Sequence, residues 1–280
     1  MLTNLNKILS DARKGGYAIA QFNFSDLEVA QGIAEGASEM GSSVIFGASE
    51  KAIEYAGIEN LVDIVKNLSE QFSQIPMALH LDHGKTFEIC QKAIEAGFTS
   101  VMVDGSKHPF EENIKLTRKV VEFAKGKDIS VEGELGMVAD LKKLEIDKDA
   151  IVFPTGEQAR EFIEKTGVDA LAVGLGTAHG LPLPDERIHF AVLKEVADAV
   201  SAPLVLHGGS NLPTLDVKKA VKMGVCKVNV DTELRQAFTG AIRKDLKDKA
   251  TLDPREYLGD AREAIKQAVI RKIKEINGEH

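Results

Sequence analysis

The sequence predicts an α/β protein with a (β/α)8 TIM barrel and a helical C-terminal extension. Short runs rich in apolar and β-branched residues alternate with longer amphipathic stretches, and this alternation repeats eight times. The runs are apolar on both faces, as in strands of a parallel sheet that is covered by helices. A length of 280 residues also suits eight such units. A doubly wound open sheet is the second interpretation, disfavoured because no Gly-x-Gly-x-x-Gly motif follows the first strand.

The elements are expected in strict alternation along the chain. The predicted strands are Tyr17–Phe24, Ser43–Ser49, Met77–His83, Ser100–Ser106, Ile129–Gly136, Ala170–Thr177, Pro203–Gly208 and Val225–Asp231. The amphipathic stretches between them are Asp26–Met40, Ile58–Phe72, Phe87–Ala96, Glu111–Lys125, Glu157–Thr166, Phe190–Val200 and Thr214–Met223. The longest connection, 137–155, is charged, and we interpret it as a lid loop. The tail over about 241–280 is predicted helical, with breaks at Pro254 and Gly259. No stretch is typical of a linker, so we expect residues 1–280 to form a single domain.

Composition excludes several classes of function. The chain has 35 Lys and Arg against 43 Asp and Glu, a net charge of −8, which argues against a nucleic-acid partner. No apolar segment is long enough for a membrane span, and the N-terminus does not resemble a signal peptide. The two cysteines, Cys90 and Cys226, exclude a disulfide framework and are expected in the core. We therefore expect a cytoplasmic protein without a membrane partner.

Polar residues occur at the C-terminal end of every predicted strand, where barrels of this kind carry their active sites. They are Asn23, Ser49, Asp82, His83, Asp104, Glu134, His179, His207 with its following glycines, and Asn229–Thr232. A barrel without a site would more often carry apolar and small residues at these positions. The pattern therefore predicts an active site at this mouth.

Three histidines at strand ends, His83, His179 and His207, are candidate metal ligands. Neutral imidazoles suit Zn²⁺, and three protein ligands leave a position open for substrate, as catalytic zinc requires. Glu134 is either a fourth ligand or part of a second metal position, and Asp104 is a weaker candidate for the same role. The other histidines (His80, His108, His189 and His280) are expected in the core, in loops or in the tail.

Asp82 directly precedes His83. Neighbouring strand residues point to opposite faces, although a turn of the backbone at a strand end can bring both into one site. Asp82 is then a candidate general acid and base beside the metal. The alternative is a carboxylate that orients a histidine ligand.

The seventh and eighth strands are followed by two short motifs that predict a phosphate site. These are His207-Gly208-Gly209-Ser210 and Asn229-Val230-Asp231-Thr232. Glycines allow backbone N–H groups to approach an anion, and hydroxyl groups add donors, in the loops where such barrels bind phosphate. Two tight turns without a ligand are the alternative.

Taken together, these motifs resemble the class II, metal-dependent fructose-bisphosphate aldolases and the tagatose-bisphosphate aldolases. The matching stretches, in the family's order, are Met77–Gly84, Ser100–Ser106, Val131–Gly136, Gly174–Gly180, Leu206–Ser210 and Cys226–Thr232. The resemblance runs from Asn4 to about Lys266. It implies reversible cleavage of fructose 1,6-bisphosphate to dihydroxyacetone phosphate and glyceraldehyde 3-phosphate.

The resemblance also implies roles for individual residues. Zn²⁺ would bind His83, His179 and His207, with Glu134 as an additional metal position, and Asp82 would be the proton donor. Dihydroxyacetone phosphate would bind Gly180, Gly208, Gly209, Ser210, Asn229, Val230, Asp231 and Thr232. Ser49, with Arg255 or Arg262, would reach the second phosphate, across a subunit interface in one arrangement. Another divalent metal could replace zinc, a monovalent cation could also take part, and a homodimer or homotetramer is expected.

Two loops depart from the family pattern. Lys142 stands near the position of the glutamate that moves a proton of the ketone half, for which Asp140 or Glu145 could substitute. Leu183 stands near the position of a lysine that pairs with phosphate. The alternatives to a fructose-bisphosphate aldolase are therefore an aldolase for tagatose 1,6-bisphosphate or another ketose phosphate, a catalytically weak homologue with a binding role, and a zinc hydrolase.

Overall fold

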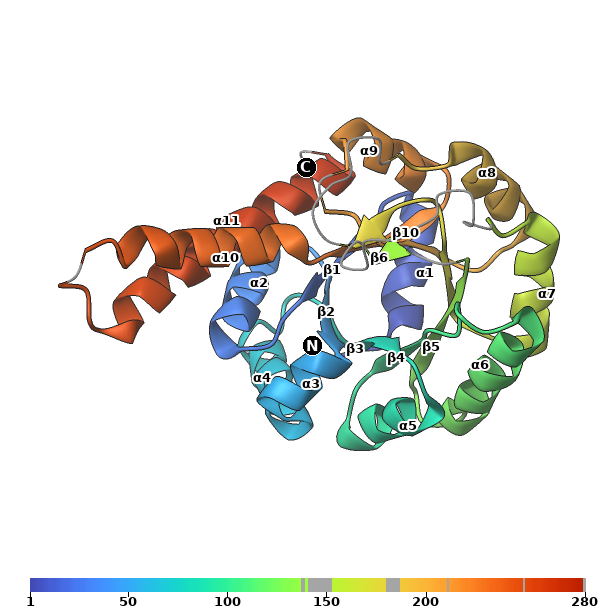
Figure 1. The fold of residues 1–280 in the computed structure, drawn as a ribbon, viewed down its shortest axis with the longest axis horizontal. Helices are drawn as coiled ribbons and strands as arrows, with labels where there is room; N and C mark the ends of the chain where they lie inside the picture. Colours follow the sequence, from blue (N-terminus) through green and yellow to red (C-terminus); the bar gives the residue numbers. More distant parts are fainter. Residues whose placement is uncertain (137–138, 141–152, 180–186, 211, 249, 279–280) are drawn as a thin grey trace.

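The computed structural model describes residues 1–136, 139–140, 153–179, 187–210, 212–248 and 250–278. Eight parallel strands close into a barrel in the order β1-β10-β9-β7-β5-β4-β3-β2 (Figure 1). They are β1 (Ile19–Asn23), β2 (Val44–Ser49), β3 (Met77–Gly84), β4 (Ser100–Val103), β5 (Ser130–Leu135), β7 (Ala170–Val173), β9 (Leu204–Leu206) and β10 (Val225–Val230). A separate two-stranded sheet pairs β6 (Ala139–Asp140) with β8 (Ala178–His179). The predicted barrel is confirmed.

Helices surround the barrel, and most begin and end within two residues of the predicted bounds (Figure 1). They are α1 (Leu5–Gly15), α2 (Leu27–Glu39), α3 (Glu50–Ala56), α4 (Ile58–Gln71), α5 (Phe87–Ala96), α6 (Phe110–Ala124), α7 (Gly156–Thr166), α8 (Phe190–Ala199), α9 (Thr214–Lys222), α10 (Thr232–Asp245) and α11 (Pro254–Asn277). Side-chain caps define several starts, because Asp26, Thr86 and Thr155 each accept a hydrogen bond from an N–H in the first turn. The sequence interpretation missed α1 and α3.

Helix α1 packs against the N-terminal ends of the strands. Its buried residues form one apolar cluster with the first inward-facing residues of the barrel: Leu5, Ile8, Leu9, Ala12, Ile19, Ile45, Ala78, Met102, Ala170, Ala172, Val205 and Cys226. This cluster, here called the floor, closes one end of the barrel. The opposite end, where the strands terminate, is the mouth.

The C-terminal extension differs in detail from its prediction. Helix α10 begins directly after β10, and α11 packs against both α10 and α2, so that the pair projects from one side of the barrel (Figure 1). Pro254 is the first residue of α11, where its missing N–H costs nothing, with Asp253 as the N-cap. Gly259 lies inside α11, so the predicted break there is wrong. None of the described helices is both long enough and apolar enough to span a bilayer.

Candidate active site

The backbone at the end of β3 brings two consecutive side chains into the mouth. His83 has φ 55°, in the left-handed region that non-glycine residues rarely adopt. The pairing of β3 with β4 also shifts register between Leu81 and Gly84. The alternation of a regular strand is thereby interrupted, and ligand atoms of Asp82, His83 and His207 all lie within 4.8 Å of one another. Such local strain is typical of functional positions.

Asp82 is a buried carboxylate held by three side-chain amides. Gln21 donates to Oδ1 at 3.1 Å, Asn23 to Oδ2 at 2.7 Å and Asn229 to Oδ1 at 3.3 Å. Gly47 leaves room for the first two amides, because a β-carbon at that position would overlap them. Burial raises the pKa of Asp82, but the surrounding positive charges and hydrogen bonds lower the pKa by more than burial raises it. The group is therefore ionised at neutral pH.

His83 is surrounded by acidic groups. Its Nδ1 lies 2.9 Å from Asp104 Oδ2 and 3.6 Å from Glu134 Oε2. Burial lowers the pKa of His83, but the carboxylates of Asp82, Asp104 and Glu134 outweigh it and raise the pKa to about 10. This environment strongly favours a positive charge at the ring, which either a proton or a metal cation supplies.

His207, directly after β9, faces His83. The Nδ1 of His207 lies 3.1 Å from the Nε2 of His83, and the rings meet edge to face with centroids 4.7 Å apart. On its other side, His207 Nε2 lies 3.1 Å from Glu132 Oε1. Burial lowers the pKa of His207, so the neutral ring is favoured.

The two facing nitrogens fit a metal ion. An ionised carboxylate only accepts hydrogen bonds, so Glu132 places the proton of neutral His207 on Nε2, and Asp104 places that of neutral His83 on Nδ1. The lone pairs of the other two nitrogens then converge. Two nitrogen ligands of a tetrahedral zinc lie about 3.3–3.4 Å apart, close to the observed 3.1 Å. His83, Asp104 and Glu134 form a second group with the same ligand spacing.

The loops after β9 and β10 are joined, as the paired motifs predict. Gly209 N donates to the Asn229 carbonyl at 2.9 Å, and Asp231 N donates to Ser210 Oγ at 3.2 Å. A β-carbon at Gly209 would collide with Val228 and with the Asn229 carbonyl. Both loops therefore lie at the same depth, next to the N-terminus of α10.

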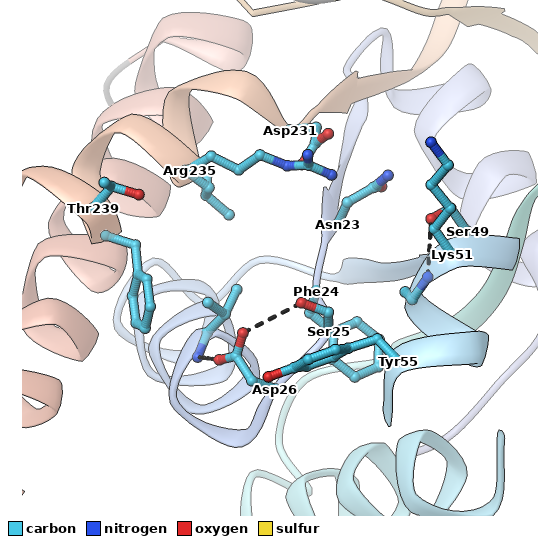
Figure 2. A pocket seen from close by; sticks show the side chains of 14 residues that line it. Asn23, Phe24, Ser25, Asp26, Ser49, Lys51, Tyr55, Asp231, Arg235 and Thr239 are labelled. Carbon is cyan, nitrogen blue, oxygen red and sulfur yellow. Dashed lines mark hydrogen bonds and ion pairs between the residues drawn. The ribbon is translucent and has the colours of Figure 1, made fainter. Parts of the chain in front are cut away.

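A cavity of about 400 Å³ opens beside Asn23 at the rim of the mouth (Figure 2). Ser49 and Lys51 lie on one side of it, and Asp231 and Arg235 on the other, with Asn23 between them in the view. Ser49 caps α3 by accepting from Ala52 N, and Arg235 Nε lies 2.7 Å from Asp231 Oδ1. Further lining comes from Tyr55 and Phe238 among others.

Known proteins are similar to this chain in architecture and in sequence. The model of the family described as fructose-bisphosphate aldolase class II matches residues 3–280. The chain belongs to the class II fructose-bisphosphate aldolase family. The family resemblance and the aldolase class of enzyme, a carbon–carbon lyase, are thereby confirmed. Class II aldolases are generally zinc-dependent.

Individual relatives cover this aldolase almost entirely. Fructose-bisphosphate aldolase from Staphylococcus aureus (strain Mu50) is 45% identical over 277 residues, which are 98% of this chain and 96% of that protein. The probable fructose-bisphosphate aldolase of Bacillus subtilis (strain 168) is 44% identical with 98% and 97% coverage. Among solved structures, the YdjI aldolase from Escherichia coli K12 has a TM-score of 0.88 and 34% identity, over 99% of this chain and 97% of that chain.

Some predicted residues of the aldolase are only partly described. His179 belongs to β8, where its backbone pairs with Asp140 of β6, which brings the two segments together at the mouth. Gly180, Lys142, Glu145 and Leu183 lie outside the described residues. His80 is buried, as predicted, but its ring lies in a polar layer, with Nδ1 2.9 Å from Ser100 Oγ.

The sequence interpretation missed several residues of the aldolase site. Gln21 and Glu132 each lie two positions before a polar residue at or next to the end of a strand, Asn23 and Glu134. Because side chains two apart share a face, this spacing could have shown that both point into the barrel. The same spacing marks Lys227, which lies two positions before Asn229, whereas no comparable signal marks Lys51 and Arg235, which lie on helices.

Proposed function

We propose that this aldolase reversibly cleaves fructose 1,6-bisphosphate to dihydroxyacetone phosphate and glyceraldehyde 3-phosphate, with Zn²⁺ bound by His83, His207 and His179. The observation that carries the proposal is the pair of imidazole nitrogens 3.1 Å apart beside the ionised carboxylate of Asp82. The substrate follows from relatives named fructose-bisphosphate aldolase at 44–45% identity. Glu134 and Asp104 would provide an additional metal position with His83.

Asp82 would accept the C4 hydroxyl proton in cleavage and return it in condensation. Its ionised form is the form able to accept that proton, and the amides of Gln21, Asn23 and Asn229 hold it in place. Zn²⁺, when bound, supplies Lewis-acid stabilisation of the negative charge left on the dihydroxyacetone phosphate half. Asp82 therefore lies on the side of the site that receives the aldehyde half.

The phosphate of the ketone half would bind between the loops after β9 and β10. The backbone of Gly208 and Gly209, the hydroxyl of Ser210 and the start of α10 at Thr232 lie together there, and the N–H of Gly209 holds the two loops together by donating to the Asn229 carbonyl. A helix N-terminus and closely approaching backbone N–H groups favour an anion. The predicted roles of Val230 and Asp231 belong to the same subsite, while Gly180 lies outside the described residues.

The second phosphate would bind in the cavity at the rim. This cavity begins at Asn23, which donates to Asp82, so it lies where an aldehyde half extending past Asp82 would reach. Lys51 and Arg235 supply positive charge, and Ser49 a hydroxyl. Arg255 and Arg262, the arginines predicted for this role, do not line the cavity of this chain and contact Asp253 and Gln31 instead.

The test is incubation of the purified protein with dihydroxyacetone phosphate in D2O, with and without a chelator, followed by NMR of the C3 proton. Metal-dependent, stereospecific exchange is expected, and no exchange by the zinc-loaded protein would reject the proposal. A coupled assay then compares fructose 1,6-bisphosphate with tagatose 1,6-bisphosphate. A higher kcat/KM for tagatose 1,6-bisphosphate would overturn the substrate assignment and leave the aldolase class intact.

A further inference from the structure

A buried ion pair crosses the interior of the barrel below the mouth. Glu132 of β5 and Lys227 of β10 are both 0% exposed, and Lys227 Nζ lies 2.7 Å from Glu132 Oε2. The strands that carry them are separated by β7 and β9 in the barrel order. Neither residue takes part in the chemistry proposed above.

Stability is a weak explanation for this pair. Moving two charges out of water is energetically costly, and well-packed apolar residues of similar volume are often at least as stabilising. The floor of the same barrel is filled by apolar side chains. The charged pair therefore calls for a role in the site that lies above it.

The second oxygen of Glu132 connects the pair to the site. Lys227 engages Oε2, which leaves Oε1 to His207 Nε2 at 3.1 Å. A carboxylate has no proton to donate, so the hydrogen of this contact belongs to His207. Its lone pair then lies on Nδ1, the atom that faces His83 Nε2.

The remaining neighbour of the pair is His80. Its Nε2 lies 3.7 Å from Glu132 Oε2, and its Nδ1 is bound to Ser100. Burial and the charge of Lys227 lower the pKa of His80 to about 3, so this ring stays neutral. Lys227 is therefore the group that balances the charge of Glu132, and burial of the pair leaves the layer without net charge.

We propose that Glu132 and Lys227 are positioning residues that hold His207 in the tautomer whose Nδ1 binds the metal. The inference rests on the proposed function, because it requires His207 to be a ligand. Carboxylates and carbonyls that accept from a metal-bound histidine commonly set its tautomer, and their loss lowers metal affinity 10–100-fold. Here Lys227 fixes the direction of the hydrogen bonds, because its ammonium group only donates and therefore requires an oxygen of residue 132 as its partner.

The first variant is Glu132→Gln, which keeps the shape and removes the charge. Lys227 attracts the amide oxygen, so the amide NH2 turns toward His207 Nε2 and requires a lone pair there. His207 is driven into the other tautomer, with its proton on Nδ1. We expect zinc affinity, measured by competition with a chromophoric chelator, to fall 10–100-fold. The absorption of the cobalt-substituted protein should change at the same time.

The matched control is the double variant Glu132→Gln with Lys227→Met. Without the ammonium group, the amide can rotate and present its oxygen to His207 Nε2. Zinc affinity and the cobalt spectrum should return toward those of the wild type. A double variant that binds zinc as weakly as Glu132→Gln, or more weakly, would overturn the proposal, because a merely structural role predicts no recovery of zinc affinity. Wild-type affinity in Glu132→Gln would overturn it as well.

A measurement on the zinc-loaded wild type keeps the proposal testable if a variant fails to fold. Long-range ¹H–¹⁵N NMR of the histidines should show a proton on His207 Nε2. A proton on Nδ1 would contradict the proposal outright. Failure of the proposed function would be distinguishable, because the wild type would then show no metal-dependent exchange of dihydroxyacetone phosphate, whatever the tautomer.

Discussion

At its N-terminal end the barrel is filled by Ile19, Ile45 and Ala78 beneath helix α1, whereas four residues further along the same strands the inward positions carry Asn23, Ser49 and Asp82. The floor buries apolar side chains that need no partners. The mouth buries ionised and amide groups, each with specific hydrogen bonds.

The difference shows how one set of strands serves two purposes. Apolar burial at the floor stabilises the fold without requiring particular partner atoms. Buried polar groups at the mouth are costly unless they are matched, and a matched network holds a defined geometry. We therefore expect substitutions at the floor to act on stability and those at the mouth to act on chemistry.

The largest effect is expected for Asp82→Asn at the mouth. The variant retains the shape but loses the carboxylate that we propose accepts the C4 hydroxyl proton, so kcat for cleavage should fall about 10²–10⁴-fold. Steady-state kinetics with a parallel measurement of bound zinc will check this. A variant that binds zinc and keeps wild-type kcat would break the assignment of chemistry to Asp82.

The opposite result is expected for Leu9→Ala at the floor. Leu9 is 1% exposed and packs in the cluster that closes the barrel. Truncation of such a side chain costs about 2–5 kcal/mol of unfolding free energy. Urea unfolding of the zinc-loaded protein should show this loss, while kcat at 25 °C remains within twofold of the wild type. A large fall in kcat with little loss of stability would contradict the assignment of stability to the floor and chemistry to the mouth.

Lys51→Met tests two parts of the mouth separately, the cavity at the rim and the centre around Asp82. Loss of one charge-assisted contact to phosphate, about 1.5–3 kcal/mol, should lower kcat/KM for fructose 1,6-bisphosphate by roughly 10–100-fold. Deuterium exchange into dihydroxyacetone phosphate should be unchanged, because that substrate lacks the second phosphate. Glu54→Gln, a charge change on the same helix outside the cavity lining, is the control. Equal loss in both assays would show that Lys51 does not serve the second phosphate.

The smallest effect concerns acid stability of the metal-free protein. Burial raises the pKa of Asp104, but the hydrogen bond and charge of His83 outweigh this effect. The folded pKa therefore lies below the unfolded value of about 3.9. Asp104 therefore contributes stability above that value, which is lost as the pH falls through the folded pKa. Between about pH 3 and 5, the unfolding free energy of the wild type rises with pH. Asp104→Asn should reduce the slope of this rise by up to the amount that corresponds to one proton bound on unfolding. Leu9→Ala should shift the curve down in parallel, and an unchanged slope in Asp104→Asn would contradict the pKa shift.

Periodicity and strand-end chemistry predicted most of the architecture and the centre of the site. The eight strands, the polar mouth, and the proximity of Asp82, His83 and His207 follow from local patterns. Helix α1 was not predicted, because its apolar face became meaningful only once the open end of the barrel was known. The cavity at the rim likewise draws Lys51 and Arg235 from helices far apart in the sequence.

The fold and the identity of the groups at the mouth can be predicted from the sequence alone, because hydrophobic period and residue type are local properties of the chain. The pairing of those groups depends on contacts that form only in the folded chain. His83 adopts a left-handed backbone conformation and contacts His207. A chain of contacts also runs from Lys227 to Glu132, which are 95 positions apart, and from Glu132 to His207, which are 75 positions apart. Which ring nitrogen of His207 faces the proposed metal position depends on these contacts, since a hydrogen bond to one ring nitrogen decides the role of the other.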